Sequence, residues 1–434
     1  KFAATREKHP TLKKFIPLKG EADEKTLPFA ELLALGAAEI ERGYTFPDRD
    51  PEALATMLFT SGTTGTSKCV MLSEKNTCSC VNAACASVNF SEKDVLLSVL
   101  PIHHTYELAI SLAALTIGAF IGINDSLRHL MRNIAEIRPT GLILVPLFVS
   151  TIHKRIMEKA KKQGKEGLIK KMTPVAAHMP RNWRRKPFSA ILETFGGRLE
   201  KIICGGAALN PELVKSFDAF GIQICEGDGI TECSPLIAVN PYFANKPGSV
   251  GPAVPRCEAR IAATGKNDLG YDEGEIQAKG DNVMMGYYNN DEANASAFTE
   301  DGWYRTGDVG YIDEDGYIHI TGRLKSVIVL ENGKNVFPEE IEEYLEDIPE
   351  IAESVVVGRK AEDSDTVILT AVVYPNKDAF PAGCTKEEMY DAIYKKLMDL
   401  NKRVASFKKI MALELRDEEF EKTTSKKIKR HLVK

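Results

Sequence analysis

Short apolar runs alternate with longer amphipathic stretches over the first half of the chain. Runs rich in β-branched and other apolar side chains, each bounded by Gly, Pro or Asp, predict strands at 53–59, 95–100, 141–147, 201–204 and 222–225. The longest apolar run, 108–123, is shorter than the ~20 residues needed to cross a bilayer, so we expect a buried helix that leads into a strand. The alternation of strands and helices predicts an α/β sheet.

The pattern changes at about residue 250, where strand-like segments are joined by tight turns. Asp-Gly and Asn-Gly pairs favour antiparallel hairpins, and they occur at Asp301-Gly302, Asp315-Gly316 and Asn332-Gly333. After residue 323 the chain alternates predicted helices with predicted strands, the helices at 338–345 and 386–400 and the strands at 354–357 and 366–374. We therefore expect a large N-terminal domain, 1–322, of layered α/β subdomains with a β-rich subdomain from about 250 to 322. A small α+β C-terminal domain, 323–434, would follow it.

Composition and charge narrow the class of protein. The chain has 434 residues, of which 44% are hydrophobic and 27% charged, as in ordinary globular proteins of two to three domains. The net charge is −5, so no overall positive field is available to hold nucleic acid. The 9 cysteines include no C-x-x-C pair, which predicts reduced thiols in a cytoplasmic compartment rather than disulfides or a zinc site. The chain begins with Lys rather than Met, and we expect that the natural start is missing.

Residues 153–187 are a local exception to the acidic balance. This basic segment contains twelve Lys and Arg against two Glu, with Trp183 and several apolar residues between them. A solvated helix face is the first interpretation. Contact with anionic lipid head groups is the second, because basic residues beside a Trp suit a membrane interface, and nucleic acid is the third.

The strongest chemical signal is the segment Thr60-Ser61-Gly62-Thr63-Thr64-Gly65-Thr66-Ser67-Lys68, which directly follows the predicted strand 53–59. Its glycines let backbone amides approach an anion, its hydroxyls donate hydrogen bonds, and its lysine supplies a positive charge. These groups are suited to binding a polyphosphate. The glycines are too close together for the G-x-x-x-x-G-K-[ST] loop. A flexible linker is the alternative interpretation.

This loop resembles the phosphate loop of the adenylate-forming enzymes, a superfamily that includes acyl-CoA synthetases, firefly luciferase and peptide-synthetase adenylation domains. Four more segments resemble motifs of that superfamily in the same order: 229–232 the adenine and magnesium segment, 304–308 the ribose turn, 322–325 the interdomain hinge and 422–430 the catalytic-lysine motif. The chain is identified as a member of this superfamily, with long-chain fatty-acid–CoA ligases as the nearest resemblance. Only 59 residues precede the loop, so we expect an N-terminally truncated member.

The resemblance implies which residues bind the nucleotide and CoA. Asp308 would accept hydrogen bonds from the ribose hydroxyls, and Glu232 with Thr63 would bind Mg²⁺. Gly333 would lie beside the CoA channel. The other residues implied in binding ATP or AMP are Thr60, Ser61, Gly62, Thr64, Gly65, Lys68, Gly205, Gly206, Ala207, Glu226, Gly227, Asp228, Gly229, Thr231 and Arg323.

The resemblance also implies the catalytic residues. Lys427 would bring positive charge to the substrate carboxylate and the α-phosphate, with Glu232 as the second catalytic group. His104, in the segment Pro101-Ile102-His103-His104-Thr105-Tyr106-Glu107, would line the entrance for the carboxylate, and Lys325 would be the pivot of a mobile C-terminal domain.

Three positions depart from the family pattern. Asp228 replaces an aromatic residue beside adenine, Cys69 a glycine after the loop lysine, and Lys426 a glycine before the catalytic lysine. The departures at Asp228 and Cys69 predict an altered affinity for the nucleotide. The departure at Lys426 leaves Lys426 and Lys427 as the two candidates for the catalytic lysine.

The implied function is that of an AMP-forming acid–thiol ligase. A fatty acid would react with ATP to give acyl-adenylate and pyrophosphate, and the acyl group would then pass to CoA. We expect a cytoplasmic protein, with peripheral contact between the basic segment and the inner face of a membrane as a further hypothesis. The alternatives are an aryl-CoA ligase, an acyl-carrier-protein ligase and a non-catalytic nucleotide-binding regulator.

Overall fold

The computed structural model describes residues 14–16, 26–60, 67–330, 334–360, 366–422 and 428–433. The chain forms two compact units, Lys1–Ala53 and Leu54–Lys434. In the first unit, a parallel bridge between Phe15 and Thr26 precedes helix α2 (Phe29–Glu41), in which no residue is buried. The second unit contains the predicted site residues.

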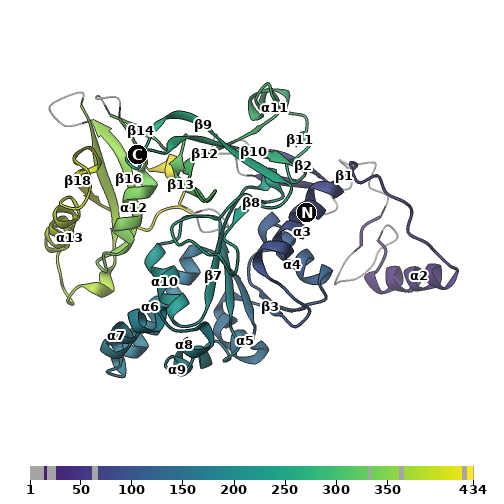
Figure 1. Cartoon of the computed structure of the whole chain (residues 1–434), viewed down its shortest axis with the longest axis horizontal. Helices are drawn as coiled ribbons and strands as arrows, with labels where there is room; N and C mark the ends of the chain where they lie inside the picture. The colour runs from purple at the N-terminus through teal and green to yellow at the C-terminus, as the bar shows by residue number, and fades with distance from the viewer. Residues whose placement is uncertain are drawn as a thin grey trace. The chain divides into compact units, whose positions relative to one another are not determined.

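A six-stranded sheet is the centre of the second unit (Figure 1). Its strands, in spatial order, are β4 (Phe120–Ile123), β3 (Val95–Ser98), β5 (Gly141–Leu144), β6 (Lys201–Gly205), β7 (Gln223–Gly229) and β8 (Leu236–Val239). All neighbours are parallel except β7 and β8. Every residue of β5 and β6 is buried, as expected for parallel strands that are covered on both faces. The predicted α/β class is confirmed.

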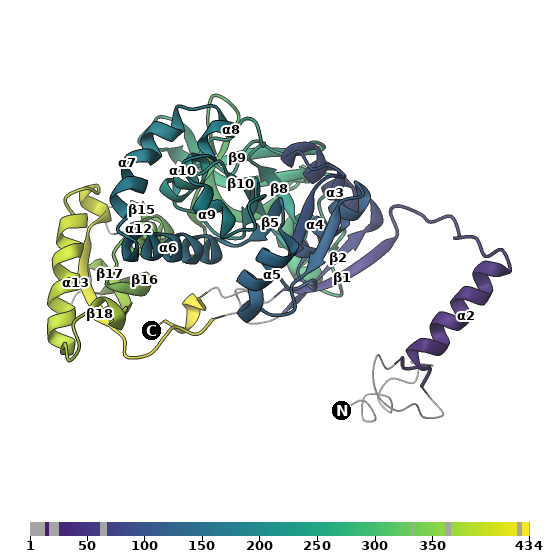
Figure 2. The same ribbon diagram turned by 90° about the horizontal axis from the view of Figure 1, so that it is seen from below.

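Helices cover both faces of this sheet (Figures 1 and 2). Alternate residues of β5 enter two different cores, with Ile143 in one and Leu142 and Leu144 in the other. The first core includes residues of α3 (Glu74–Val88) and α4 (Thr105–Thr116). The second core includes residues of five helices: α5 (Leu130–Ile137), α6 (Pro146–Lys162), α7 (Glu166–Ala177), α9 (Ser189–Glu193) and α10 (Pro211–Ala219). The short helix α8 (Arg181–Arg184) follows α7.

The apolar run 108–123 is a helix followed by a strand, as predicted. It comprises most of α4 and then β4. In the described part of the chain, no helix is both long and apolar enough to cross a membrane.

One predicted strand of the α/β sheet lies elsewhere. Residues 53–59 correspond to β1 (Leu54–Thr60), which pairs antiparallel with β2 (Lys68–Ser73) in a separate sheet that also contains β11 (Gly286–Tyr287). The short connection between β1 and β2 favours this antiparallel pairing, because a parallel neighbour needs a longer crossover. The predicted strand 141–147 is also too long, since Pro146 occupies the first position of α6.

The β-rich layer has four antiparallel strands. Their order is β13 (Ile318–Arg323), β12 (Tyr304–Ile312), β10 (Asp272–Gly280) and β9 (Cys257–Lys266), and α11 (Asp291–Ala297) precedes β12. The Asp315-Gly316 turn joins β12 to β13, as predicted. Asp301-Gly302 instead turns between the bridge partners Phe298 and Tyr304, and Asn332-Gly333 lies outside the described residues.

The C-terminal residues form an α+β arrangement with its own core. The strands β16 (Ile351–Lys360) and β17 (Val367–Pro375) are antiparallel, and β18 (Ile410–Leu415) is parallel to β17. The helices α12 (Pro338–Glu346) and α13 (Lys386–Leu400) pack Ile341, Leu345 and Leu397 into this core. Two short strands, β14 (Ile328–Val329) and β15 (Asn335–Val336), precede α12. The predicted fold of this part is confirmed, and the domain boundary at 322/323 stays a prediction.

Candidate active site

The candidate site begins at the carboxyl ends of β6 and β7, where open α/β sheets bind ligands. Gly205 at the end of β6 pairs with Gly227 of β7. A Cβ atom on Gly205 would lie 2.9 Å from the carbonyl oxygen of Gly227, so the close pairing requires glycine. Gly206 and Ala207 follow β6 and are exposed. The structure therefore brings the two predicted adenine-binding segments, 205–207 and 227–229, side by side.

Glu226 lies beneath this edge rather than on it. Its side chain is 5% exposed, and its Oε1 accepts a hydrogen bond of 3.2 Å from the amide of Leu209. Within the described residues, its buried Oε2 has no hydrogen-bond partner. Burial raises the pKa of Glu226 to about 8, and the nearby carboxylates of Glu343 and Asp228 add to this shift. Glu226 is therefore a largely protonated acid at neutral pH.

Glu232 and Lys68 both contact the side chain of Tyr287. Glu232 belongs to the 3₁₀ turn η2 (Thr231–Cys233), which follows β7. The hydroxyl of Tyr287 donates a hydrogen bond of 2.8 Å to Glu232 Oε1, and the Tyr304 hydroxyl lies 3.4 Å from that of Tyr287. Lys68 Nζ lies 4.7 Å from the centre of the Tyr287 ring. Burial and the Glu232 carboxylate raise the pKa of Tyr287, so its hydroxyl keeps its proton and remains a donor.

Tyr287 is a site residue that the sequence analysis missed. The aromatic pair Tyr287-Tyr288 after a glycine was the available signal. That pair alone does not reveal the pairing of β11 with β2, which brings Tyr287 opposite Val70.

Asp308 and Arg323 form an ion pair between two strands. They are register partners in β12 and β13, and Arg323 Nε lies 2.8 Å from Asp308 Oδ1. The residue Asp308 is 3% exposed, whereas the side chain of Arg323 is half exposed. Gly307, with φ of +75°, lies within β12 just before Asp308, where the pairing of β12 with β10 is irregular, and the amide of Leu324 donates to its carbonyl oxygen. The structure thus pairs the predicted ribose-binding segment, 304–308, with the predicted hinge segment, 322–325.

His104 precedes α4 and is partly buried. Because β3 is parallel to its neighbours, His104 lies at the same edge of the sheet as Gly205 and Gly227. A Cβ atom on Gly205 would lie 3.9 Å from Cζ of Tyr106, so the start of α4 adjoins the end of β6.

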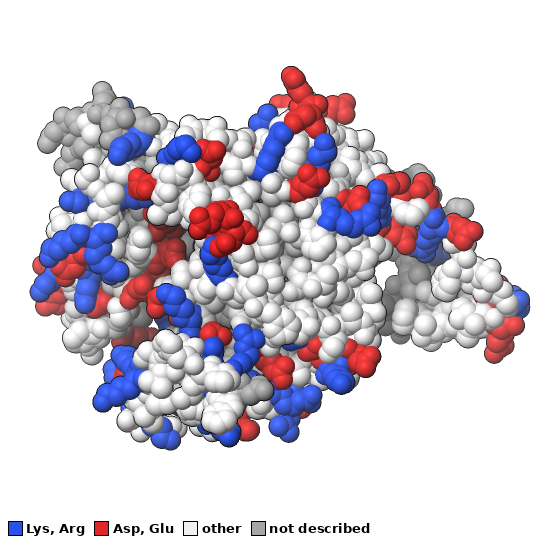
Figure 3. Space-filling view, viewed as in Figure 1, with Lys and Arg blue, Asp and Glu red and all other residues white. Residues whose placement is uncertain are grey.

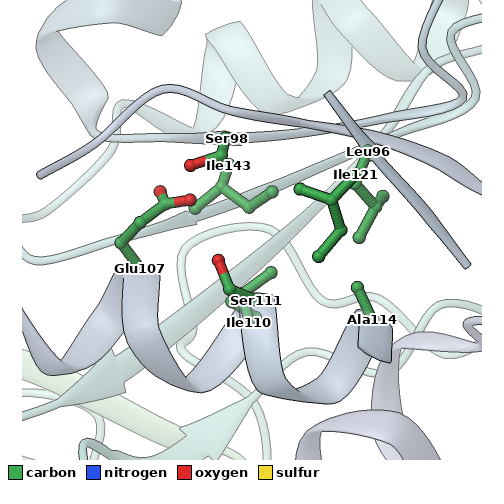
Figure 4. Close-up of a pocket in the computed structure, with 8 residues that line it drawn as sticks. All are labelled: Leu96, Ser98, Glu107, Ile110, Ser111, Ala114, Ile121 and Ile143. Atoms are coloured by element: carbon green, nitrogen blue, oxygen red, sulfur yellow. The ribbon is translucent and has the colours of Figure 1, made fainter. Parts of the chain in front are cut away.

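Glu107 lies inside the protein behind His104. It points with Ser98 and Ser111 into a small enclosure between α4 and the sheet, which is otherwise lined by Leu96, Ile110, Ala114, Ile121 and Ile143 (Figure 4). Glu107 Oε2 accepts a hydrogen bond of 3.1 Å from the amide of Leu100, and burial raises the pKa of this carboxyl group. Glu107 therefore ties the end of β3 to α4 and fixes the segment that carries His104.

Several predicted site residues lie outside the described residues. They are Ser61, Gly62, Thr63, Thr64, Gly65, Gly333, Lys426 and Lys427. The described ends of the loop are Thr60 and Lys68, which are register partners in β1 and β2. Lys325 follows β13 in a segment where a Cβ atom on Gly322 would lie 2.7 Å from Phe337, so the chain passes closely against the residue before α12.

The donor set around Glu232 fits Mg²⁺ that arrives with a polyphosphate. In the ranges that the structure describes, no three His, Cys, Asp or Glu side chains cluster as a metal site. Mg²⁺ in nucleotide sites commonly takes one or two carboxylates and completes its shell with phosphates and water. Glu232 supplies one carboxylate, and a hydrogen bond from Tyr287 holds its Oε1, which is consistent with this arrangement.

Two matches to protein-family models show the family of this chain. Residues 3–288 match the model of the AMP-binding enzyme family, and residues 325–434 match the model of the AMP-binding enzyme C-terminal domain. The chain therefore belongs to the AMP-binding enzyme family, and its resemblance to adenylate-forming enzymes is confirmed.

Among curated proteins, the chain is similar to long-chain acyl-CoA ligases. It is 32% identical over 326 residues to the long-chain-fatty-acid–CoA ligase FadD15 of Mycobacterium bovis, covering 70% of this chain and 52% of that protein. It is 30% identical over 382 residues to the peroxisomal long chain acyl-CoA synthetase 6 of Arabidopsis thaliana, covering 84% of this chain and 53% of that protein. The chain thus spans about half the length of these relatives.

Solved structures share the fold. ATP-bound MatB from Rhodopseudomonas palustris superposes with a TM-score of 0.68 at 30% identity, covering 90% of this chain and 69% of that one. The o-succinylbenzoate CoA synthetase MenE of Bacillus subtilis, in complex with the acyl-adenylate OSB-AMP, has a TM-score of 0.71 at 21% identity and covers 99% of this chain and 80% of that one. The second likeness concerns the fold alone.

Proposed function

We propose that this chain is the adenylate-forming part of an ATP-dependent fatty-acyl-CoA ligase. In the first step a carboxylate oxygen attacks the α-phosphorus of ATP, the bond to the β-phosphate breaks, and acyl-adenylate and pyrophosphate form. In the second step the CoA thiol loses its proton and attacks the acyl carbonyl, and AMP leaves. The observation that carries the proposal is the meeting of Lys68 and Glu232 at the Tyr287 ring beside the edge of β6 and β7.

The described residues support specific roles in nucleotide binding. Lys68 would supply positive charge to the phosphates from the start of β2, and Glu232 would hold Mg²⁺, whose chemistry there would be to offset negative charge on the polyphosphate. Gly206, where an added Cβ atom would meet nothing within 4 Å, leaves space for the adenine ring just after β6, whereas Gly205 and Gly227 allow the strand ends to pair closely. Asp308, held by Arg323, accepts hydrogen bonds from the ribose hydroxyls.

The second step requires a second arrangement of the C-terminal residues. Lys427 must be near the α-phosphate during adenylation and must leave before a thiol can approach the same carbonyl carbon. Rotation about Lys325 would exchange Lys427 for Gly333 and open the CoA channel. The position of Lys325 supports a pivot there, because it lies between β13 of the β-rich layer and the first residues that pack into the C-terminal core, Ile328 and Leu330.

A fatty acid is the proposed substrate, because the relatives at 30–32% identity are named long-chain fatty-acid or acyl-CoA ligases. His104 would receive the carboxylate at the sheet edge. The test supplies ATP and Mg²⁺ with palmitate or benzoate, measures pyrophosphate, and then offers CoA or holo acyl carrier protein. Pyrophosphate with palmitate and thioester with CoA support the proposal. Preference for benzoate or for the carrier protein supports the corresponding alternative, and nucleotide binding without pyrophosphate release supports the regulator.

We also propose that the protein works in the cytoplasm with its basic segment against an anionic membrane. Of the twelve basic residues, three arginines are hydrogen-bonded to other parts of the protein, and Lys170 forms an exposed ion pair with Glu166 one helical turn away. Arg184 donates to the Met179 carbonyl and pairs with Asp218, Arg185 donates to the carbonyls of Leu199 and Gly221, and Arg181 pairs with Gln223. These three arginines stabilise the fold and are not available to a membrane.

The other basic residues of the segment are exposed: Lys154, Arg155, Lys159, Lys161, Lys162, Lys165, Lys170, Lys171 and Lys186. Apolar side chains accompany them, with Leu168 60%, Val175 50% and Trp183 64% exposed. In the lower part of Figure 3, Lys and Arg border a white surface over α7 to α9. A lysine near an anionic bilayer contributes about 1 kcal/mol to binding, and Trp suits the interface.

Co-sedimentation with vesicles tests the membrane proposal. We expect binding to vesicles of phosphatidylcholine with phosphatidylglycerol and none to phosphatidylcholine alone. The double substitution Lys161→Glu and Lys162→Glu should weaken binding, and Trp183→Ala should weaken it further. The matched control is Lys395→Glu with Lys396→Glu, an exposed lysine pair on α13. Equal loss in both double variants would indicate a general charge effect and contradict the proposed surface.

A further inference from the structure

Tyr287 connects two groups that are far apart in sequence. Its hydroxyl is hydrogen-bonded to the Glu232 carboxylate, and its ring lies against the Lys68 ammonium group. Lys68 is the first residue of β2, directly after the predicted phosphate loop, whereas Glu232 follows β7 of the central sheet. One side chain thus contacts both the cationic and the anionic group proposed to act on the polyphosphate.

The position of Tyr287 is fixed from several sides. Its residue is 5% exposed, and it pairs with Val70 where β11 meets β2. The side-chain amide of Asn294 accepts a hydrogen bond of 2.7 Å from the Tyr287 amide and donates one of 2.9 Å to its carbonyl oxygen. The ring therefore cannot shift without breaking backbone contacts.

The Glu232 segment is fixed to the same chain region. The amide of Met284, shortly before β11, donates a hydrogen bond of 2.8 Å to the Glu232 carbonyl oxygen. Within the described residues, Tyr287 makes the one hydrogen bond to the Glu232 carboxylate. The hydroxyl holds Oε1, so rotation of the carboxylate is restricted and Oε2 is left for a metal ion.

We infer that Tyr287 is a positioning residue, which orients Glu232 for Mg²⁺ and keeps Lys68 at a fixed place beside it. This inference rests on the proposed function, because it takes Glu232 as the metal ligand. Partners behind a metal ligand commonly change metal affinity about tenfold or more when they are removed. The hydroxyl and the ring have separable effects, since only the hydroxyl contacts the carboxylate and only the ring contacts the ammonium group.

The experiment titrates Mg²⁺ into the protein with a fluorescent ATP analogue and measures binding rather than turnover. In Tyr287→Phe we expect the Mg²⁺ concentration for half-maximal binding to rise about tenfold. Affinity for the nucleotide in EDTA should stay within about twofold, because the ring over Lys68 is retained. A thermal unfolding midpoint near that of the wild type checks the fold.

The matched control is Tyr288→Phe, which removes a hydroxyl from the next residue. Tyr288 is half exposed, and we expect its variant to keep the wild-type Mg²⁺ dependence. An unchanged Mg²⁺ requirement in Tyr287→Phe, or an equal rise in both variants, overturns the inference and leaves the ligase proposal intact. If the wild type binds nucleotide without any dependence on Mg²⁺, both the metal role of Glu232 and the inference fail.

Discussion

At the residue scale, burial decides what the carboxyl groups around the site can do. Asp308 is buried beside a guanidinium group, whereas Glu226 is buried beside two other carboxylates. A buried carboxylate is costly unless it is paired, so Glu226 takes up a proton. The two acids of this region thus have opposite surroundings, with a positive charge beside Asp308 and negative charges beside Glu226.

Glu226 makes the stability of the protein dependent on pH. Its folded pKa of about 8 lies above the ordinary value of 4.5, so the folded state binds the proton more tightly than the unfolded state. Stability is therefore full below pH 4.5 as far as this group is concerned, and it falls as pH rises toward 8. We expect Glu226→Gln to remove this loss and to raise the free energy of unfolding at pH 8 by roughly 1–3 kcal/mol.

Urea unfolding of both proteins at pH 4 and pH 8 measures this effect. At pH 4, below the ordinary value of 4.5, the two proteins should be nearly equal, because wild-type Glu226 is then mostly protonated in both the folded and the unfolded state and Gln has a similar shape. A difference of the same size at both pH values would show that packing rather than ionisation separates them.

Lys427 gives a prediction about rate. We expect Lys427→Ala to slow adenylation roughly 10²- to 10³-fold, the usual effect of losing one preorganised charge in a transition state. Nucleotide affinity should change little, because the proposed nucleotide-binding residues Lys68 and Asp308 are unchanged in this variant. Pre-steady-state pyrophosphate release compares this variant with Lys426→Ala, and a larger loss in the second variant would assign the role to Lys426.

At the element scale, the start of α3 ties the β-rich layer to the central sheet. Ser73 and Asn76 form a capping box, and the Asn76 side chain also donates hydrogen bonds of 2.8 Å to the carbonyls of Asp281 and Val283. These carbonyls belong to the segment between β10 and β11, which carries Met284 and then Tyr287. Asn76 therefore stabilises the segment that leads to Tyr287.

We expect Asn76→Ala to lower the free energy of unfolding by roughly 2–3 kcal/mol, because it breaks a cap and leaves two carbonyls without these donors. Chemical denaturation measures the change. Thr77→Ala is the control, since among the described residues the Thr77 side chain makes one long hydrogen bond, of 3.4 Å, to the Ser73 carbonyl. If the two variants lose stability equally, the contacts to residues 281 and 283 contribute little.

The elements that the sequence predicted well are those with strong local signals. Helix 386–400 begins at a Thr385 capping box, and the buried strands at 141–144 and 201–205 each contain a run of consecutive apolar residues. The sheet to which β1 belongs could not be predicted, because its partners are chosen by contacts rather than by its own composition. The pairing of β2 with β11 joins residues 70–71 to 286–287, which no local pattern reveals.

The same distinction applies to the candidate site. The glycines at the ends of β6 and β7 and the Asp308 turn could be predicted, because each lies in a motif of adjacent residues. Tyr287 could not be, since its role depends on two contacts with residues 68 and 232. The burial of Glu226 was also missed, because strand direction alone does not say which face a polar residue takes.

At the scale of the whole molecule, the proposed second step requires movement of the C-terminal residues about the proposed pivot, Lys325. A hydrogen bond of 2.9 Å from the Asn210 side-chain amide to Asp347 joins the first part of the second unit to the end of α12 in this arrangement. That contact would have to break when the C-terminal residues rotate.

We expect Lys325→Pro to spare acyl-adenylate formation and to suppress thioester formation, because proline fixes φ at about −65° and prevents the rotation. The two half-reactions are measured separately, the first as pyrophosphate release and the second as acyl transfer from preformed adenylate to CoA. The control is Lys325→Ala, which should keep both steps. Lys334→Pro is not a suitable control, because Lys334 lies beside β15. Equal loss of both steps in the proline variant would contradict a pivot at this residue.

The central proposal is that the protein forms an acyl-adenylate at the site that contains Lys68, Glu232 and Asp308. The most direct measurement is the exchange of labelled pyrophosphate into ATP, which requires reversible adenylate formation and no CoA. We predict exchange that depends on both a fatty acid and Mg²⁺ and that falls sharply in Glu232→Gln. Exchange that proceeds without a carboxylic acid, or none from a folded protein that binds ATP, would contradict the account.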